Sequence, residues 1–461
     1  MSVFSSNSSM WRRAMGSRHI QSFADDGDHN NEGYRALPRR SARLAQLTTE
    51  RANRNRSQDI NVGTVRCDAP LDVQESDGED DSTSEDHDST SEDDGPGTLA
   101  TSDDPVKPVP STGPTVISSP PHTTRKQLRH LIRQQKFHER REQERREYKA
   151  RRSIMHRAKG ARGYAGNRIS GKEPKEGMVE ISMDNRVAVS VFDSHGRKTV
   201  HRAHKCKRPD VLNACNEAAR LVEVHGMRPT FDTSQERGKF KTYYFSLHRG
   251  STELPRFSKD IMHNCELYNK LVSVLDPVMK YVAGIFKAEF PALYERYANA
   301  MDTVNSKHPE LHACFFPFAS FCINMSKTGV VTVKHIDMQN LAPGLCVVIP
   351  FGDFDPAIDC KLHVVELGYT FQLAAGTPIF FPSALYTHYN SELISKGMRG
   401  SIVAWTGASV FQYVDLGCRA VQNLSAYEVT EYKAGLKDRV RRGFRLFPKM
   451  KPVVNKTVEL Q

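Results

Sequence analysis

Residues 345–381, which read LCVVIPFGDFDPAIDCKLHVVELGYTFQLAAGTPIFF, decide the fold of this chain. Four apolar runs rich in β-branched and aromatic residues follow one another here: 345–351, 362–367, 369–373 and 377–381. Glycines punctuate the segment at Gly352, Gly368 and Gly376. Such runs favour short β-strands, and glycines favour the turns between them. The segment therefore predicts several strands that wrap into a β-barrel.

Two histidines and an aspartate flank this strand-rich segment. His335 and Asp337 precede it, and His388 follows it. Alternate side chains of an extended segment share a face, so His335 and Asp337 can contact one metal ion. Two imidazoles and one carboxylate are the ligands of non-heme Fe(II) oxygenase sites. We therefore predict that His335, Asp337 and His388 bind Fe(II) at a catalytic centre, whose open positions take 2-oxoglutarate and O2. The alternative is that they are ordinary polar groups of a β-sandwich.

An arginine and a serine lie a short distance beyond the second histidine. Arg399 and Ser401 belong to the run RGSIVAW, which predicts another strand, so the two side chains share a face. A guanidinium group can bind a carboxylate through two parallel hydrogen bonds. We predict that Arg399 binds the distal carboxylate of 2-oxoglutarate and that the Ser401 hydroxyl supports it.

These motifs resemble a group of basidiomycete fungal proteins, the TET/JBP-like 2-oxoglutarate and Fe(II)-dependent dioxygenases, which are often associated with transposable elements. The segments that carry the resemblance are HIDMQNLAPGLCVVIPFGDFDP, PSALYTHYN and MRGSIVAWTGASVFQYVDLG. The resemblance covers about residues 176–450 and implies an α+β fold, a double-stranded β-helix (jelly-roll or cupin-like) barrel flanked by helices. It implies the same iron ligands and the same role for Arg399. Asn324, a candidate for co-substrate binding, and Asn340 match polar positions of the pattern.

The resemblance also implies a substrate, the methyl group of a methylated base, 5-methylcytosine, in nucleic acid. An enzyme that acts on a duplex base must flip the base into a pocket. Four aromatic residues are candidates for the lining, although such residues more often belong to the core: Phe316, Phe318, Tyr386 and Tyr389. Two alternatives stay open: the same chemistry on a protein or small molecule, and a non-catalytic, transposon-derived nucleic-acid-binding protein.

One position departs from the family pattern. A Gly-Gly pair usually follows the GDFDP turn, whereas this chain has Ile358-Asp359-Cys360-Lys361. Glycine allows positive φ and a close approach of the backbone to a ligand. The departure predicts altered substrate entry or impaired activity.

The chain outside this domain is polar and highly charged. Residues 1–124, with an acidic block at 75–94, lack a sustained apolar period and are predicted to be disordered, and residues 451–461 form a tail. Residues 125–163 alternate Arg with Glu and predict an exposed basic helical arm. We expect residues 125–162 to contact the phosphate backbone of nucleic acid, the alternative being a solvated arm without a ligand.

The folded part is expected to begin near Gly177. Predicted strands cover 178–183, 187–192, 198–201, 241–247 and 315–325, and predicted helices cover 209–224, 260–300 and 432–446. The second of these helices is expected to be interrupted near Pro277.

Composition narrows the class of protein. A net charge of +11 and a pI near 9.1 suit a polyanionic partner. Nine cysteines without a CxxC pair argue against a secreted disulfide scaffold, and no apolar run is long enough for a membrane span. We therefore expect a nuclear or nucleo-cytoplasmic protein, with a mitochondrial presequence in the first 24 residues as the alternative. The sequence predicts no oligomeric state.

Overall fold

The computed structural model describes most of the chain from Arg145 to Met450 and a few residues before it. The described residues are 124–126, 128–133, 136, 145–158, 161, 163–166, 172, 174, 177–184, 186–232, 236–250 and 254–450. The predictions for residues 1–123, including the acidic block 75–94, and for the tail 451–461 fall outside the described residues.

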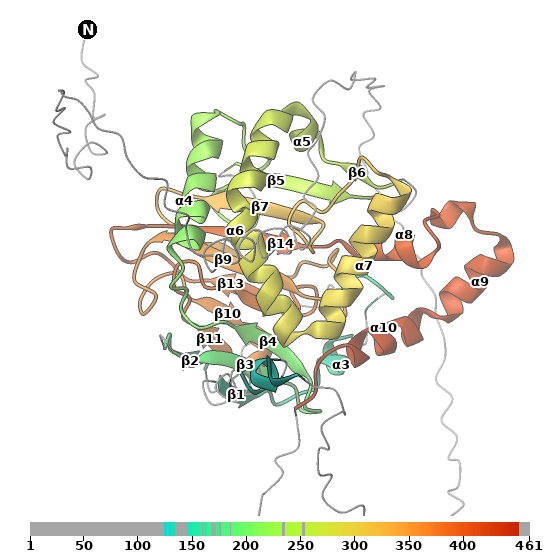
Figure 1. Ribbon diagram of the computed structural model, residues 1–461, viewed down its shortest axis with the longest axis horizontal. Coiled ribbons are helices and arrows are strands. Elements are labelled where there is room, and N and C mark those ends of the chain that lie inside the picture. Colours follow the sequence, from blue (N-terminus) through green and yellow to red (C-terminus); the bar gives the residue numbers. More distant parts are fainter. Residues whose placement is uncertain are drawn as a thin grey trace, which may run out of the picture. The chain divides into compact units, whose positions relative to one another are not determined.

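The described chain forms two β-sheets, and the expected mixture of helices and sheets is confirmed (Figure 1). The larger sheet has the order β1-β3-β4-β12-β9-β14-β7-β5-β6, and the smaller has the order β2-β11-β10-β13-β8. The strands are β1 (Arg145–Lys149), β2 (Val179–Ile181), β3 (Ala188–Phe192), β4 (Lys198–Arg202), β5 (Lys241–His248), β6 (Arg256–Phe257), β7 (Ser320–Met325), β8 (Thr332–His335), β9 (Cys346–Asp353), β10 (Leu362–Val364), β11 (Tyr369–Phe371), β12 (Ile379–Phe381), β13 (His388–Asn390) and β14 (Met398–Trp405).

The eight strands from β7 to β14 wind back and forth between the two sheets. In chain order β7, β9, β12 and β14 belong to the larger sheet, and β8, β10, β11 and β13 belong to the smaller one. All pairings among these eight strands are antiparallel. A jelly roll is expected to have two antiparallel sheets whose strands the chain contributes by passing repeatedly from one sheet to the other. This winding returns β13 and β14 beside β8 and β7, so segments far apart in sequence meet.

Helices cover one face of the larger sheet (Figure 1). They are α4 (Pro209–Val224), α5 (Lys259–His263), α6 (Cys265–Glu289) and α7 (Pro291–Lys307), and α8 (Ala408–Asp415) packs on α7. Phe286 of α6 is fully buried and stacks on Phe318 and on Phe380 of β12, with ring centroids 5.3 and 5.5 Å apart. The apolar stripe of the helix therefore anchors it on the sheet. None of the described helices is long and apolar enough to cross a membrane.

The prediction of one basic helix through residues 125–163 is wrong beyond its first part. Residues 125–126, 128–133 and 136 are helical, but Arg145–Lys149 forms β1, which pairs in parallel with β3. The short helix α3 (Ile154–Arg157) follows, with Ile154 fully buried. Strand pairing and core packing therefore override the helical preference of the charge pattern. The folded domain begins by Arg145 rather than near Gly177.

Two helix boundaries also differ from prediction. Pro277 does not interrupt α6, which continues through it from Cys265 to Glu289. Side chains on both sides of the proline, such as Leu275 and Val278, are buried. The chain breaks instead at Phe290, before Pro291. The expected terminal helix is divided at Gly435 into α9 (Ala426–Ala434) and α10 (Leu436–Arg445).

Candidate metal centre and co-substrate pocket

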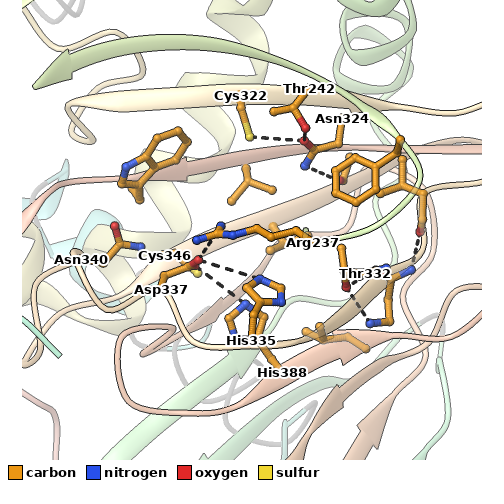
Figure 2. Close-up of a pocket in the computed structure, with 18 of the residues that line it drawn as sticks. Arg237, Thr242, Cys322, Asn324, Thr332, His335, Asp337, Asn340, Cys346 and His388 are labelled. Carbon is orange, nitrogen blue, oxygen red and sulfur yellow. Dashed lines mark hydrogen bonds and ion pairs between the residues drawn. The ribbon is translucent and has the colours of Figure 1, made fainter. Parts of the chain in front are cut away.

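His335, Asp337 and His388 converge on one point, and the pairing of two strands explains why. His335 ends β8 and His388 begins β13, where the two residues face each other in the ladder. Asp337 lies two residues past β8. Each of its carboxylate oxygens lies 3.8 Å from an imidazole Nε2, Oδ1 from His335 and Oδ2 from His388. The three ligand atoms lie within 4.8 Å of one another, a spacing that one metal ion can bridge (Figure 2).

Backbone carbonyls fix the orientation of both imidazole rings. His335 Nδ1 lies 2.7 Å from the carbonyl oxygen of Val333, and His388 Nδ1 lies 2.9 Å from that of Tyr386. A carbonyl only accepts, so each Nδ1 carries the hydrogen and donates it. Each Nε2 then keeps its lone pair on the side of Asp337. A hydrogen bond of this kind on the second nitrogen is the usual support of a metal-binding histidine.

The three side chains have the protonation states that a cation requires. Burial lowers the pKa of His335, and burial together with the nearby His335 lowers the pKa of His388 to about 3. Burial alone would raise the pKa of Asp337, but its electrostatic interactions with His388, His335 and Arg237 outweigh burial and lower that pKa. At neutral pH the site therefore presents two neutral imidazoles and one carboxylate, the forms that bind a metal ion.

Arg237 also contacts this carboxylate, and no pattern in the sequence predicts that contact. Its Nη1 lies 2.9 Å from Asp337 Oδ1 (Figure 2). The arginine lies in the segment before β5, whose carbonyl at Arg237 accepts a hydrogen bond from the Val333 amide of β8. Gly238 has φ +147°, and a Cβ there would lie 2.1 Å from the carbonyl oxygen of Val331. Glycine therefore permits the close approach of this segment to β8.

Arg399 lies deep in the same cavity, and its side chain has no partner among the residues that the structure describes. Its exposed fraction is 3%, and its Nε is buried with no hydrogen-bond acceptor. Among the described residues, no carboxylate pairs with its guanidinium group. The cavity has a volume of about 300 Å³ and is also lined by the three converging side chains. A buried charge without a partner is costly, so this position suits an anionic ligand that enters the cavity.

Ser401 and Asn324 form a polar line beside Arg399. They face each other across β14 and β7, and Asn324 faces Thr242 across β7 and β5. Thr242 Oγ1 donates to Asn324 Oδ1 at 2.9 Å, and Asn324 Nδ2 donates to Ser401 Oγ at 3.2 Å (Figure 2). Because Ser401 Oγ accepts in this pair, its own hydrogen remains for another acceptor. All three side chains line the cavity, as does Asn340, whose amide donates to Ser383 Oγ.

The four aromatic residues proposed as pocket lining do not line this cavity. Phe318 packs on α6, Tyr386 is buried, Phe316 lies 6.4 Å from Tyr294 and Tyr389 stacks on His363. Neighbouring side chains of a strand point to opposite faces, so Tyr389 must point away once His388 points in. The aromatic lining residues are Phe240, Tyr244 and Trp405. The alternation that places Arg399 and Ser401 on one face of the strand also places Trp405 on that face, so the sequence contained a signal for this lining residue.

The missing Gly-Gly pair does not remove the positive φ from this loop. Cys360 has φ +46°, in the region that glycine favours. Asp359 stabilises the loop, because its carboxylate accepts the backbone amides of Ile394, Ser395 and Asp355 at 2.7 to 2.9 Å. Neither Asp359 nor Cys360 lines the cavity. The backbone conformation expected of the glycines is thus present without them.

Comparisons with known proteins find only distant likenesses. The sequence matches no protein-family model and no curated protein. The structure is similar to that of NgTET1 in complex with 5mC DNA, at 16% identity and a TM-score of 0.38, over 50% of this chain and 83% of that chain. It is also similar to the viral collagen prolyl hydroxylase vCPH from Paramecium Bursaria Chlorella virus-1 in its 2OG complex, at 11% identity and a TM-score of 0.27, over 45% and 95%. A Pseudomonas putida prolyl-4-hydroxylase matches at 10% identity and a TM-score of 0.25, over 46% and 92%. Likenesses this distant assign no activity, which has to be inferred from the side chains.

Proposed function

We propose that the domain is a 2-oxoglutarate- and Fe(II)-dependent dioxygenase that hydroxylates the methyl group of 5-methylcytosine in nucleic acid. One observation carries the enzyme class. A cluster of two histidines and a carboxylate shares a cavity with Arg399, a buried cation that has no counter-ion in the described part of the chain. A metal ion and a dicarboxylate supply what these two sets of side chains lack.

The side chains present fit both groups. His335, Asp337 and His388 would hold Fe(II), while Arg399 and the free hydrogen of Ser401 would hold the distal carboxylate of 2-oxoglutarate. When bound, Fe(II) with 2-oxoglutarate and O2 supplies the oxidation that converts a substrate C–H bond to C–OH, with succinate and CO2 released. The chain fixes the rings through the carbonyls of Val333 and Tyr386 and keeps Asp337 ionised.

The sequence resemblance supports the choice of substrate, and the cavity is compatible with it. Tyr244 and Trp405 offer aromatic surface, and Asn340 offers an amide that can hydrogen-bond a base. One alternative is the same chemistry on a protein or small molecule. The other is a nucleic-acid-binding protein without catalytic activity.

A coupled assay tests this proposal. Purified full-length protein receives Fe(II), 2-oxoglutarate and O2 with methylated DNA, single-stranded and duplex, and succinate and oxidised bases are measured together. We expect equal amounts of both products, and neither from Asp337→Ala. Succinate that rises only with a protein or small-molecule substrate would support the first alternative, and no turnover with any substrate would support the second.

We further propose that the basic segment 125–162 binds nucleic acid and that the protein acts in the nucleus or nucleo-cytoplasm. Lys126, Arg129 and Arg133 are exposed. Deleting residues 1–136 keeps β1 and should weaken DNA binding and flatten its salt dependence, because each neutralised phosphate releases counterions. Deleting the acidic block 75–94 alone should tighten binding.

Equal affinity and salt slope for the full and truncated chains would show that the segment is solvated. An exclusively cytoplasmic fluorescent fusion would contradict the proposed location.

A further inference from the structure

Three aromatic rings form a row that leads from the metal cavity to the surface. The rings of Trp405 and Tyr244 lie 5.1 Å apart, and those of Tyr244 and Phe231 lie 5.2 Å apart, both in edge-to-face contact. Trp405 and Tyr244 line the cavity, whereas Phe231 does not and is 46% exposed. The inner end of the row therefore shares the cavity with the iron-binding cluster, and the outer end faces solvent.

The backbone holds the row in place. Tyr244 of β5 and Val403 of β14 both lie opposite Cys322 of β7, so Trp405, two residues beyond Val403, lies on the same face as Tyr244. Phe231 extends the row past β5. Its amide and carbonyl both bond to Thr242, at 3.2 and 2.8 Å, and the Tyr244 amide donates to Thr230 Oγ1 at 2.9 Å. These bonds keep the exposed ring beside Tyr244 and lower the entropy lost when a ligand binds it.

The charges beside the row favour an anionic ligand. Besides Arg237, which pairs with Asp337, residues 228–241 carry three exposed cations, Arg228, Lys239 and Lys241, against the acids Asp232 and Glu236. A row of aromatic rings also suits a proline-rich peptide, but such a peptide has no negative charge to match these cations. A nucleic-acid strand has both a π-face on every base and a phosphate at every nucleotide.

We propose that Phe231, Tyr244 and Trp405 bind neighbouring unpaired bases of one nucleic-acid strand, the innermost of which enters the metal cavity. The bases of an intact duplex stack on one another, and flipping a single base gives a partner to only one end of the row. For the exposed ring of Phe231 to bind a base as well, a second base has to be unpaired. The inference rests on the proposed function and sharpens its substrate to single-stranded or locally opened nucleic acid.

Tryptophan fluorescence tests this proposal without iron, 2-oxoglutarate or turnover. The chain has two tryptophans, Trp11 and Trp405, so full-length Trp11→Phe leaves Trp405 as the reporter in the row. A single-stranded oligonucleotide that contains 5-methylcytosine should quench it at least about tenfold more tightly than the same sequence as a duplex. A strand of abasic sugar-phosphate, which can still bind other basic segments, should quench it little.

Variants of Phe231 locate the effect. Phe231→Ala should weaken single-strand affinity about tenfold, Phe231→Tyr, which keeps a ring without adding a tryptophan, should retain it, and the matched control Tyr427→Ala, at a ring that is 74% exposed on α9, should leave it unchanged. Equal affinity for single strand and duplex, or no effect of Phe231→Ala, would overturn the proposal. Quenching by a proline-rich peptide but not by the oligonucleotide would overturn it in favour of a peptide ligand. Base-dependent quenching without any turnover would support the inference and contradict the proposed dioxygenase activity. Turnover on duplex DNA that Phe231→Ala does not alter would contradict the inference alone.

Discussion

Two groups of buried ionic side chains in this domain differ in whether the protein supplies the partners. Around Glu289, at the end of α6, Arg145 Nη2 lies 2.6 Å and Lys198 Nζ lies 2.8 Å from the same carboxylate oxygen, and His201 lies 3.7 Å from it. In the cavity, Arg399 has no counter-ion among the described residues, and the cluster of Asp337, His335 and His388 has room for a cation.

The difference separates a structural role from a binding role. The Glu289 cluster joins β1 and β4 to α6, so its contacts stabilise the fold, and it needs no ligand. In the cavity, Asp337 pairs with Arg237 at the edge of the cluster, and Arg399 keeps no counter-ion among the described residues, although a buried charge without a partner is costly. Buried charges without protein partners are typical of a site that a ligand completes.

The largest effect is expected from the metal cluster. Asp337→Ala removes the only carboxylate of the cluster and should abolish succinate formation, since two imidazoles alone do not complete the ligand set. Circular dichroism and thermal unfolding should show that the variant remains folded. Turnover at the wild-type rate would show that the cluster is not the iron site.

Arg399→Lys tests the other half of the cavity. A lysine keeps the charge but loses the two parallel hydrogen bonds to a carboxylate. We expect the KM for 2-oxoglutarate to rise at least about tenfold, with Fe(II) affinity nearly unchanged. An unchanged KM would exclude Arg399 as the anchor.

Glu289→Gln should have the opposite pattern, a loss of stability without a change in co-substrate binding. Burial alone would raise the pKa of Glu289, but His201, Lys198 and Arg145 lower it to about 2. The carboxylate therefore contributes stability that is complete above its ordinary pKa of 4.5 and is lost as the pH falls towards 2. Urea unfolding at pH 7 should show a loss of about 3 kcal/mol, which shrinks at low pH. A difference that does not depend on pH would contradict the ionic explanation.

Ser401→Ala should have the smallest effect of the four. It removes one hydrogen bond from an uncharged hydroxyl and leaves the charge of Arg399 in place, so the KM for 2-oxoglutarate should rise only about fivefold, on the order of 1 kcal/mol. Asn324 then loses its acceptor, and Asn324→Ala measured alone and in the double variant would show whether the two side chains act as a unit. Additive effects would mean that the Asn324–Ser401 hydrogen bond does not position the serine.

The sequence predicted the part of this site that depends on local periodicity. Alternation within a strand placed Arg399 beside Ser401, and the apolar runs between His335 and His388 corresponded to strands that bring the two histidines together. The same rule, applied two steps further, past Val403, would have found Trp405.

The remaining features depend on contacts that no local pattern encodes. Arg237 meets Asp337 across 100 residues, through a segment that lies beside β8 because Gly238 permits it. The sequence of β1 has the charge spacing of a helix, yet its pairing with β3 and the ion pair of Arg145 with Glu289 make it a strand. The positive φ of Cys360 depends on Asp359, which binds the backbone of a distant turn.

An anaerobic titration of the Fe(II)-loaded protein with 2-oxoglutarate, followed by visible absorption, tests most directly whether the cavity is completed by these two groups. The wild-type protein and Glu289→Gln should develop the same charge-transfer band at the same 2-oxoglutarate concentration. Arg399→Lys should require at least about tenfold more 2-oxoglutarate, and Asp337→Ala should show no band. A full-strength band in Asp337→Ala, or an identical midpoint in Arg399→Lys, would contradict the assignment of the cluster to iron and of Arg399 to 2-oxoglutarate.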